Sequence, residues 1–235
     1  MRTAVVLPVF NEAATLTEVL DALQRIGGMD IVLVDDGSTD ETPGIAKQRR
    51  LSCVWTHPSN LGYGRSLIDG FRHVIDGGYE ACITMDADAQ HEPDRIPCFL
   101  DKLKDFDIVS GSRYLDPELM KQGIPPPERL EINRLVTERI NAITGYRLTD
   151  SFCGFKAYRT EGLSKLRLTE ENYGMPLQVW IQAFRAGLTV TECAIPLIYR
   201  DHSRNFNDRF ADREERLAHY LEVLARETAL LSTPL

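Results

Sequence analysis

The stretch Ala81-Cys82-Ile83-Thr84-Met85-Asp86-Ala87-Asp88-Ala89-Gln90 joins a short apolar run directly to an acidic run. Its first half, 81–85, has the length and composition of a buried β-strand. Residues two apart in an extended segment project to the same side, so Asp86 and Asp88 are expected to present their carboxylates toward one point. The stretch therefore predicts a strand that ends in a pair of acidic side chains.

This acidic pair offers the oxygen ligands that Mg²⁺ or Mn²⁺ prefers. Such cations are usually held by one or two carboxylates together with the phosphates of a substrate. Gln90 adds a neutral oxygen, so the predicted metal ligands are Asp86, Asp88 and Gln90. The alternative is a strand-end turn, where aspartates bond to nearby backbone. His91 is expected to lie in the turn or behind the ligands.

The chain around the acidic pair alternates β-rich runs with segments of helical period. Strands are expected at 4–7, 31–34, 53–56, 81–85 and 108–110, and helices at 12–25, 40–49, 62–76 and 93–104. This alternation indicates a mostly parallel sheet with helices on both faces, where ligands bind at the carboxyl ends of the strands. Polar clusters at 8–12, 35–38, 60–64 and 86–88 follow these strands and are expected to converge on one edge.

The pattern loosens after residue 110. A Pro/Gly-rich connection covers 116–127, helices are expected at about 128–143, 174–186 and 208–231, and strands around 152–158 and 188–199. A length of 235 residues with 43% apolar residues suits one α/β domain.

The composition narrows the class of protein. A net charge of −8 argues against a nucleic-acid partner. The five cysteines form no CxxC pair, which argues against a zinc site or a disulfide framework and suits a reducing cytosol. Since no stretch approaches the roughly 20 apolar residues of a membrane span, no transmembrane segment is expected. We expect a cytoplasmic protein, with peripheral contact at the cytoplasmic membrane face left open. The oligomeric state is not indicated.

Two polar clusters suggest a nucleotide. Asp36 follows the strand at 31–34 and is expected to bind a base or a ribose hydroxyl, while Ser38, Thr39 or Asp40 caps the next helix. The run Asn-Leu-Gly-Tyr-Gly-Arg-Ser at 60–66 predicts a glycine-assisted helix start that lets the backbone approach a ligand. It matches neither GxxxxGK[ST] nor GxGxxG, which disfavours a P-loop NTPase and a Rossmann dehydrogenase.

Taken in order, these motifs resemble glycosyltransferase family 2, and within it the branch of dolichyl-phosphate mannosyltransferase and other polyprenyl-phosphate sugar transferases. The matching stretches are Pro8–Glu12, Val34–Ser38, Asn60–Gly64, Asp86–His91, Gly111–Tyr114 and Asp150–Lys156. The resemblance implies an α/β protein with the GT-A fold, a Rossmann-like three-layer sandwich with a mostly parallel central sheet. It also implies a single domain, 1–235, with a donor-binding half at about 1–113 and an acceptor half at about 114–235.

The resemblance assigns roles to particular residues. Asp88 is implied as the principal metal ligand, with Asp86 and Gln90 beside it, and Arg113 as a cation near the donor phosphates or the acceptor. Arg200 and Arg204 match a basic segment of the family, although the intervening loop is shorter here and contains no glycine. The implied donor-binding residues are Pro8, Phe10, Glu12, Val34, Asp36, Asp86, Ala87, Asp88, Arg113, Arg200 and Arg204.

The implied activity is that of an inverting, metal-dependent hexosyltransferase that uses a GDP- or UDP-sugar. Its acceptor stays open between a polyprenyl phosphate and a hydroxyl of a glycan or small molecule. A lipid phosphate is already an anion, whereas a hydroxyl needs a general base, for which Asp150 is the candidate and a turn role the alternative. The catalytic candidates are therefore Asp88, Asp150 and Arg113.

Two other classes of protein compete with this interpretation. A nucleotidyltransferase would carry a glycine-rich, basic loop after the first strand, and residues 8–12 contain none. A non-catalytic nucleotide-sugar-binding protein would bind the donor without transferring or hydrolysing it.

Overall fold

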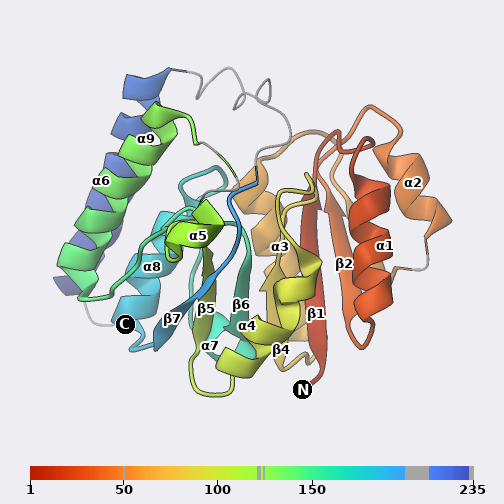
Figure 1. The fold of residues 1–235 in the computed structure, drawn as a ribbon, viewed down its shortest axis with the longest axis horizontal. Helices are drawn as coiled ribbons and strands as arrows, with labels where there is room; N and C mark the ends of the chain where they lie inside the picture. Colours follow the sequence, from red (N-terminus) through yellow and green to blue (C-terminus); the bar gives the residue numbers. More distant parts are fainter. Residues whose placement is uncertain (50, 121–122, 124, 199–211, 233–235) are drawn as a thin grey trace.

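The central sheet has seven strands in the order β3-β2-β1-β4-β6-β5-β7 (Figure 1). The computed structural model describes all residues except 50, 121–122, 124, 199–211 and 233–235. Six of the strands run parallel, and β6 runs antiparallel between β4 and β5. The strands are β1 (Thr3–Val9), β2 (Asp30–Asp35), β3 (Cys53–Thr56), β4 (Ala81–Thr84), β5 (Ile108–Ser112), β6 (Lys156–Arg159) and β7 (Val190–Ala194).

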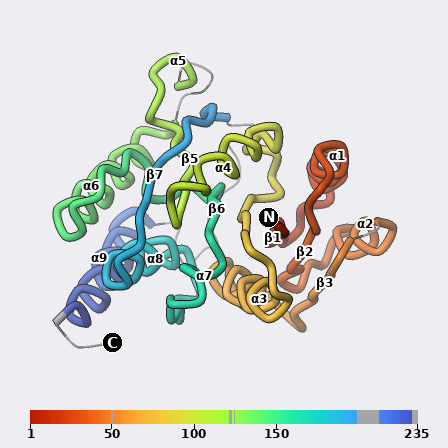
Figure 2. The backbone as a smooth tube through the Cα atoms, turned by 90° about the horizontal axis from the view of Figure 1, so that it is seen from below, coloured from red at the N-terminus to blue at the C-terminus, as the bar shows by residue number. Residues whose placement is uncertain are grey.

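Helices cover both faces of this sheet because alternate strand residues point to opposite sides. In β1, Val5 and Leu7 pack in one apolar cluster with α1 (Leu16–Ile26), α2 (Thr42–Gln48) and α4 (Ile96–Lys102). The neighbouring Ala4 and Val6 pack in a second cluster with α3 (Tyr63–Asp76) and α8 (Met175–Arg185). Figure 2 shows α1 and α3 on opposite sides of β1 and β2. The predicted three-layer α/β sandwich is confirmed.

Two long helices extend the second layer beyond α8. α6 (Pro127–Thr144) and α9 (Arg213–Ala229) pack against α8 and against each other (Figure 2). Asp212 caps α9 by accepting hydrogen bonds from Glu214 N and Glu215 N. The short elements are α5 (Pro117–Met120), α7 (Thr160–Leu163), η1 (Pro93–Arg95) and η3 (Leu230–Ser232). None of the helices in the described ranges has the length and apolar character needed to cross a bilayer.

Three predicted boundaries are wrong for identifiable reasons. The strand expected at 152–158 begins only at Lys156, because the chain at Gly154 bends against Asp86, where a Cβ would lie 2.4 Å from Asp86 Oδ2. The helix expected from residue 12 begins at Leu16, because residues 12–15 form a turn on Glu12 O. The segment expected as one helix at 93–104 is divided into η1 and α4. The beginning of the helix expected at 208–231 falls outside the described residues.

Candidate active site

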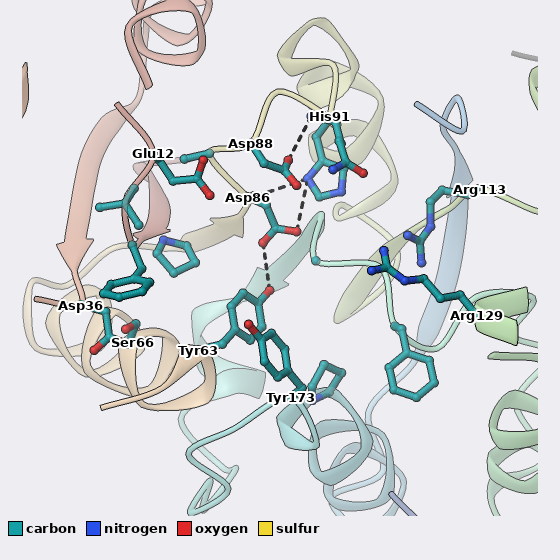
Figure 3. Close-up of a pocket in the computed structure, with 18 of the residues that line it drawn as sticks. Glu12, Asp36, Tyr63, Ser66, Asp86, Asp88, His91, Arg113, Arg129 and Tyr173 are labelled. Atoms are coloured by element: carbon teal, nitrogen blue, oxygen red, sulfur yellow. Dashed lines mark hydrogen bonds and ion pairs between the residues drawn. The ribbon is translucent and has the colours of Figure 1, made fainter. Parts of the chain in front are cut away.

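A cavity of about 520 Å³ opens at the carboxyl ends of β1, β2 and β4. Residues from the first half of the chain line one side of it, and residues from α6 and α9 line the other. Figure 3 shows Asp86 and Asp88 facing the cavity, with Arg113 and Arg129 across from them. The cavity therefore has an acidic end and a basic end.

The acidic end is built by the turn that follows β4. Asp88 Oδ1 accepts a hydrogen bond from Gln90 N at 3.0 Å, and Ala89 between them adopts φ 58°, a left-handed conformation that few non-glycine residues take. This turn brings Asp86, Asp88 and Gln90 to the same cavity. The tight turn after β4 therefore leaves the carboxylates of Asp86 and Asp88 on the wall of the cavity.

Neighbours from three segments surround Asp86. Tyr63 donates its hydroxyl to Asp86 Oδ1 at 3.1 Å, and Gly154 packs directly against both carboxylate oxygens. His91 Nδ1 accepts a hydrogen bond from Asp86 N at 3.3 Å, while Asp86 Oδ2 lies 3.9 Å from that nitrogen, beyond hydrogen-bond distance. His91 is buried behind the acidic turn and packs on Phe155. It thus supports the turn rather than extending the acidic pair.

The donor set fits a divalent cation that takes part of its coordination from a substrate. The described residues contain no group of three His, Cys, Asp or Glu side chains able to enclose a metal. Two carboxylates beside an open cavity are what Mg²⁺ and Mn²⁺ use when phosphates complete the coordination. Asp86 and Asp88, with Gln90 next to them, are the residues that could hold such a cation.

The predicted nucleoside residues divide into two groups. Pro8, Phe10, Glu12 and Asp36 line the cavity. Val34 is 1% exposed and its side chain packs in the apolar cluster between the sheet and α3, so that side chain does not line the cavity, and contact of Val34 with a nucleoside stays a prediction. The strand alternation explains this, since Val34 lies on the face that α3 covers.

Asp36 ties the end of β2 to the start of α3. Its Oδ1 accepts a hydrogen bond from Leu61 N at 2.8 Å and lies 2.7 Å from His57 Nδ1, and its Oδ2 accepts one from Gly62 N at 2.8 Å. The residue is 4% exposed, although it lines the cavity. Its carboxylate therefore fixes the loop that precedes α3, and contact with a base or ribose remains a prediction.

The glycines at the start of α3 have a packing role. A Cβ on Gly62 would lie 2.3 Å from Glu171 O, and one on Gly64 would lie 2.2 Å from Glu170 O. The N–H of Arg65 donates to Glu171 O at 3.1 Å. The 170–172 segment occupies the space where a Cβ would lie, so these glycines are needed for packing, and approach of this backbone to a ligand stays a prediction.

Arg113 lies in a two-bond ion pair with a buried aspartate. Its Nε donates to Asp150 Oδ2 at 2.6 Å and its Nη2 to Asp150 Oδ1 at 3.0 Å. Asn133 Nδ2 donates to the same Oδ1 at 2.7 Å. Burial alone would raise the pKa of Asp150, but the guanidinium and these hydrogen bonds outweigh it and hold that pKa below its ordinary value.

This geometry does not support Asp150 as a general base. Asp150 is 0% exposed and its oxygens are occupied, whereas Arg113 lines the cavity. Glu192 accepts hydrogen bonds from Thr149 N and Asp150 N, and burial raises the pKa of Glu192. Asp150 therefore orients Arg113, and Glu192 holds the backbone that carries Asp150.

The basic end of the cavity contains residues that the sequence interpretation missed. Arg129 comes from α6, and Arg216 and Tyr220 come from α9. Arg216 is 5% exposed and forms an ion pair with Glu128. Charged residues on a predicted helix usually indicate a face exposed to water, so no local sequence pattern identifies these side chains as cavity residues. Arg200 and Arg204, which the sequence assigns to the donor, lie outside the described residues.

The mostly parallel three-layer sandwich, with an acidic pair after a central strand, is the arrangement that the GT-A fold predicts. The model of the family described as glycosyl transferase family 2 matches residues 4–167. The chain belongs to this family.

Named relatives confirm the resemblance to polyprenyl-phosphate sugar transferases. The undecaprenyl-phosphate mannosyltransferase of Micrococcus luteus is 29% identical over 209 residues, covering 86% of this chain and 85% of that protein. The polyprenol monophosphomannose synthase of Mycolicibacterium smegmatis is 28% identical over 210 residues, covering 85% of this chain and 78% of that protein.

A solved structure confirms the fold. Glucosyl-3-phosphoglycerate synthase from Mycobacterium tuberculosis, in complex with Mn²⁺, UDP and glucosyl-3-phosphoglycerate, superposes with a TM-score of 0.72. The alignment covers 97% of this chain and 80% of that chain at 21% identity.

Proposed function

We propose that this protein transfers a sugar from a nucleoside diphosphate sugar to a polyprenyl phosphate, with inversion at the anomeric carbon. The observation that carries the proposal is one cavity with Asp86 and Asp88 at one end and Arg113, Arg129 and Arg216 at the other. A donor diphosphate with its cation suits the acidic end, and an anionic acceptor suits the basic end.

The donor half of the proposal rests on the residues around β1, β2 and β4. Pro8 and Phe10 offer apolar surface to a nucleoside, and the acidic pair faces the place where a diphosphate would lie. A bound Mg²⁺ or Mn²⁺ supplies Lewis-acid stabilisation of the charge on a phosphate leaving group. The structure of glucosyl-3-phosphoglycerate synthase with Mn²⁺ and UDP supports a metal and a nucleotide here as well.

The acceptor half rests on the arginines. Arg113 is held in a fixed orientation by Asp150, so its remaining surface faces the cavity as a pre-positioned cation. A guanidinium is well suited to bind a phosphate. A phosphate acceptor is already charged and needs no base, which agrees with an Asp150 whose oxygens are occupied. The names of the two relatives supply the lipid part of the proposal.

We further propose that residues 1–235 form one domain. Strands of the two halves alternate within one sheet, since β6 of the acceptor half lies between β4 and β5 of the donor half, and β7 of the acceptor half pairs with β5. Both halves line the same cavity, which supports this interpretation.

A transfer assay with a matched pair of variants tests the proposal. Labelled UDP- and GDP-sugars are offered with Mn²⁺ or Mg²⁺ to vesicles that contain undecaprenyl phosphate, and label in the lipid phase is measured. We expect transfer that chelation abolishes. Asp88→Asn should reduce it at least about 100-fold, because outer-shell partners of metal sites already cost about 10–100-fold. Asp94→Asn, on the exposed surface of η1, should leave it unchanged.

Two outcomes would contradict the proposal. Transfer that persists after chelation and in Asp88→Asn would show that the reaction does not need the proposed metal site. In a parallel reaction that offers phosphoglyceric acid, label that reaches this compound but never the lipid would show that the arginines bind a small anionic acceptor instead.

A further inference from the structure

Tyr63 is the first residue of α3, and its side chain lies between the acidic end of the cavity and the 164–174 segment. Its hydroxyl donates to Asp86 Oδ1 at 3.1 Å. Its ring stacks on Tyr173, with the ring centroids 5.7 Å apart and the planes inclined by 15° (Figure 3). Both tyrosines line the cavity.

The backbone on either side of Tyr63 is fixed by hydrogen bonds. Gly62 N donates to Asp36 Oδ2 at 2.8 Å, and Arg65 N donates to Glu171 O at 3.1 Å. The backbone of α3 therefore starts at a defined place, and the stack on Tyr173 restricts the rotation of the ring. The hydroxyl of Tyr63 reaches Asp86 from a rigid support.

Among the described residues, Tyr63 forms the hydrogen bond to the Asp86 carboxylate, and the other neighbours named above form none with it. Gly154 limits its carboxylate from one side by contact alone, and His91 lies too far from Oδ2 to form a hydrogen bond. A carboxylate that binds a cation must keep one oxygen directed at it, and an outer-shell hydrogen bond to the other oxygen is the common way to achieve this. The Tyr63 hydroxyl is placed to do so.

We propose that Tyr63 is a positioning residue for the metal-facing carboxylate of Asp86, and that Tyr173 holds Tyr63 in that role. This inference rests on the proposed function, since it requires a cation at Asp86 and Asp88. It also links the two halves of the chain, because Tyr173 belongs to the segment next to α8 and α9.

The direct test measures Mn²⁺ binding rather than turnover. Free Mn²⁺ is followed by electron paramagnetic resonance during titration of wild type, Tyr63→Phe and Asp88→Asn, each with Mn²⁺ alone, with UDP and with GDP. Tyr63→Phe keeps the ring stack and removes only the hydroxyl. We expect it to weaken Mn²⁺ binding about tenfold, the lower end for an outer-shell partner, with little change in urea stability.

Tyr79→Phe is the matched control. Tyr79 donates its hydroxyl to Asp30 Oδ2 at 2.8 Å, and Asp30 is the first residue of β2, at the end of the strand away from the cavity. The control loses the same type of hydrogen bond, so its Mn²⁺ affinity should equal that of wild type. Equal losses in both tyrosine variants would show a general effect on the fold and overturn the inference.

The remaining outcomes separate the two proposals. If Asp88→Asn loses Mn²⁺ and Tyr63→Phe stays within about twofold of wild type, the positioning role is wrong and the metal site stands. If wild type binds no Mn²⁺ with either nucleotide, both the metal-dependent function and the positioning role of Tyr63 are wrong.

Discussion

Replacing Asp150 by asparagine should destabilise the protein by an amount that its contacts define. Asp150 is fully buried and accepts hydrogen bonds from Arg113 Nε, Arg113 Nη2 and Asn133 Nδ2. Asparagine is neutral and turns one acceptor oxygen into an NH₂ group that faces these donors. The substitution therefore leaves Arg113 without its counter-charge, and the new NH₂ group faces another hydrogen-bond donor instead of accepting from it.

The expected loss follows from the burial of the pair. Removing one partner of a buried ion pair costs about 3–5 kcal/mol. The side chain of Arg113 is 22% exposed, so water partly solvates the remaining charge. We expect about 3 kcal/mol, the lower end of that range. For a domain of this size the loss corresponds to a fall of about 6–12 °C in Tm.

The pH dependence has a definite sign. Because the pKa of Asp150 in the folded protein lies below its ordinary value, the ion pair stabilises the fold at neutral pH. This contribution is lost as the pH falls through the folded-state pKa. The difference in unfolding free energy between wild type and Asp150→Asn should thus be constant from neutral pH to about pH 5 and shrink below about pH 4.

Urea unfolding, repeated across this pH range, measures the effect. The control is Glu138→Gln, which removes an Arg134–Glu138 pair of 3.0 Å whose side chains are 79% and 67% exposed. An exposed pair of this kind contributes less than about 0.5 kcal/mol. A loss below about 1 kcal/mol in Asp150→Asn, or one that does not depend on pH, would refute the role given to the buried pair.

Three further substitutions or labels probe other parts of the structure. Gly154→Ala should cost about 1–3 kcal/mol of unfolding free energy in urea, because its Cβ would meet Asp86 Oδ2 at 2.4 Å; wild-type stability would contradict this packing. Gly44→Ala, inside α2, should instead stabilise by about 0.4–1 kcal/mol in the same assay, because the new Cβ would lie 3.6 Å from Glu41 Oε2, an ordinary van der Waals contact. Iodoacetamide at pH 8 should label the exposed Cys98 in the native protein and leave the buried Cys153 unmodified, since burial raises the pKa of Cys153 to about 12. Peptide mass spectrometry measures the labelling, and equal labelling of the two cysteines would contradict the burial of Cys153.

The acidic turn shows how far sequence reasoning reaches. Asp86 and Asp88 stand two residues apart after an apolar strand, and that spacing alone brings both carboxylates to one side. The structure places both on the cavity. Local geometry decides this feature, so a short sequence window contains the information.

Asp150 and the glycines of α3 show the limit of the same reasoning. The sequence placed Asp150 near a strand, but only the fold brings Arg113 and Asn133 to its oxygens. Similarly, the sequence around Gly62 and Gly64 predicts a loop that approaches a ligand. Only the fold shows that the position of a Cβ at either glycine is occupied by carbonyl groups more than 100 positions away in the chain. Close packing between distant segments leaves no mark in a local pattern.

By itself, the sequence determined the three-layer sheet, the family and the acidic end of the cavity. These depend on the alternation of apolar residues along strands and on motifs of a few residues. Only the tertiary structure decided the basic end, where α6 and α9 turn Arg129 and Arg216 toward the cavity, and the contact of Tyr63 with Asp86. The physical reason is that a helix carries several charged side chains that look alike in the sequence. Only the packing of the helix against its neighbours and its ion pairs decide which of them face the cavity and which face water.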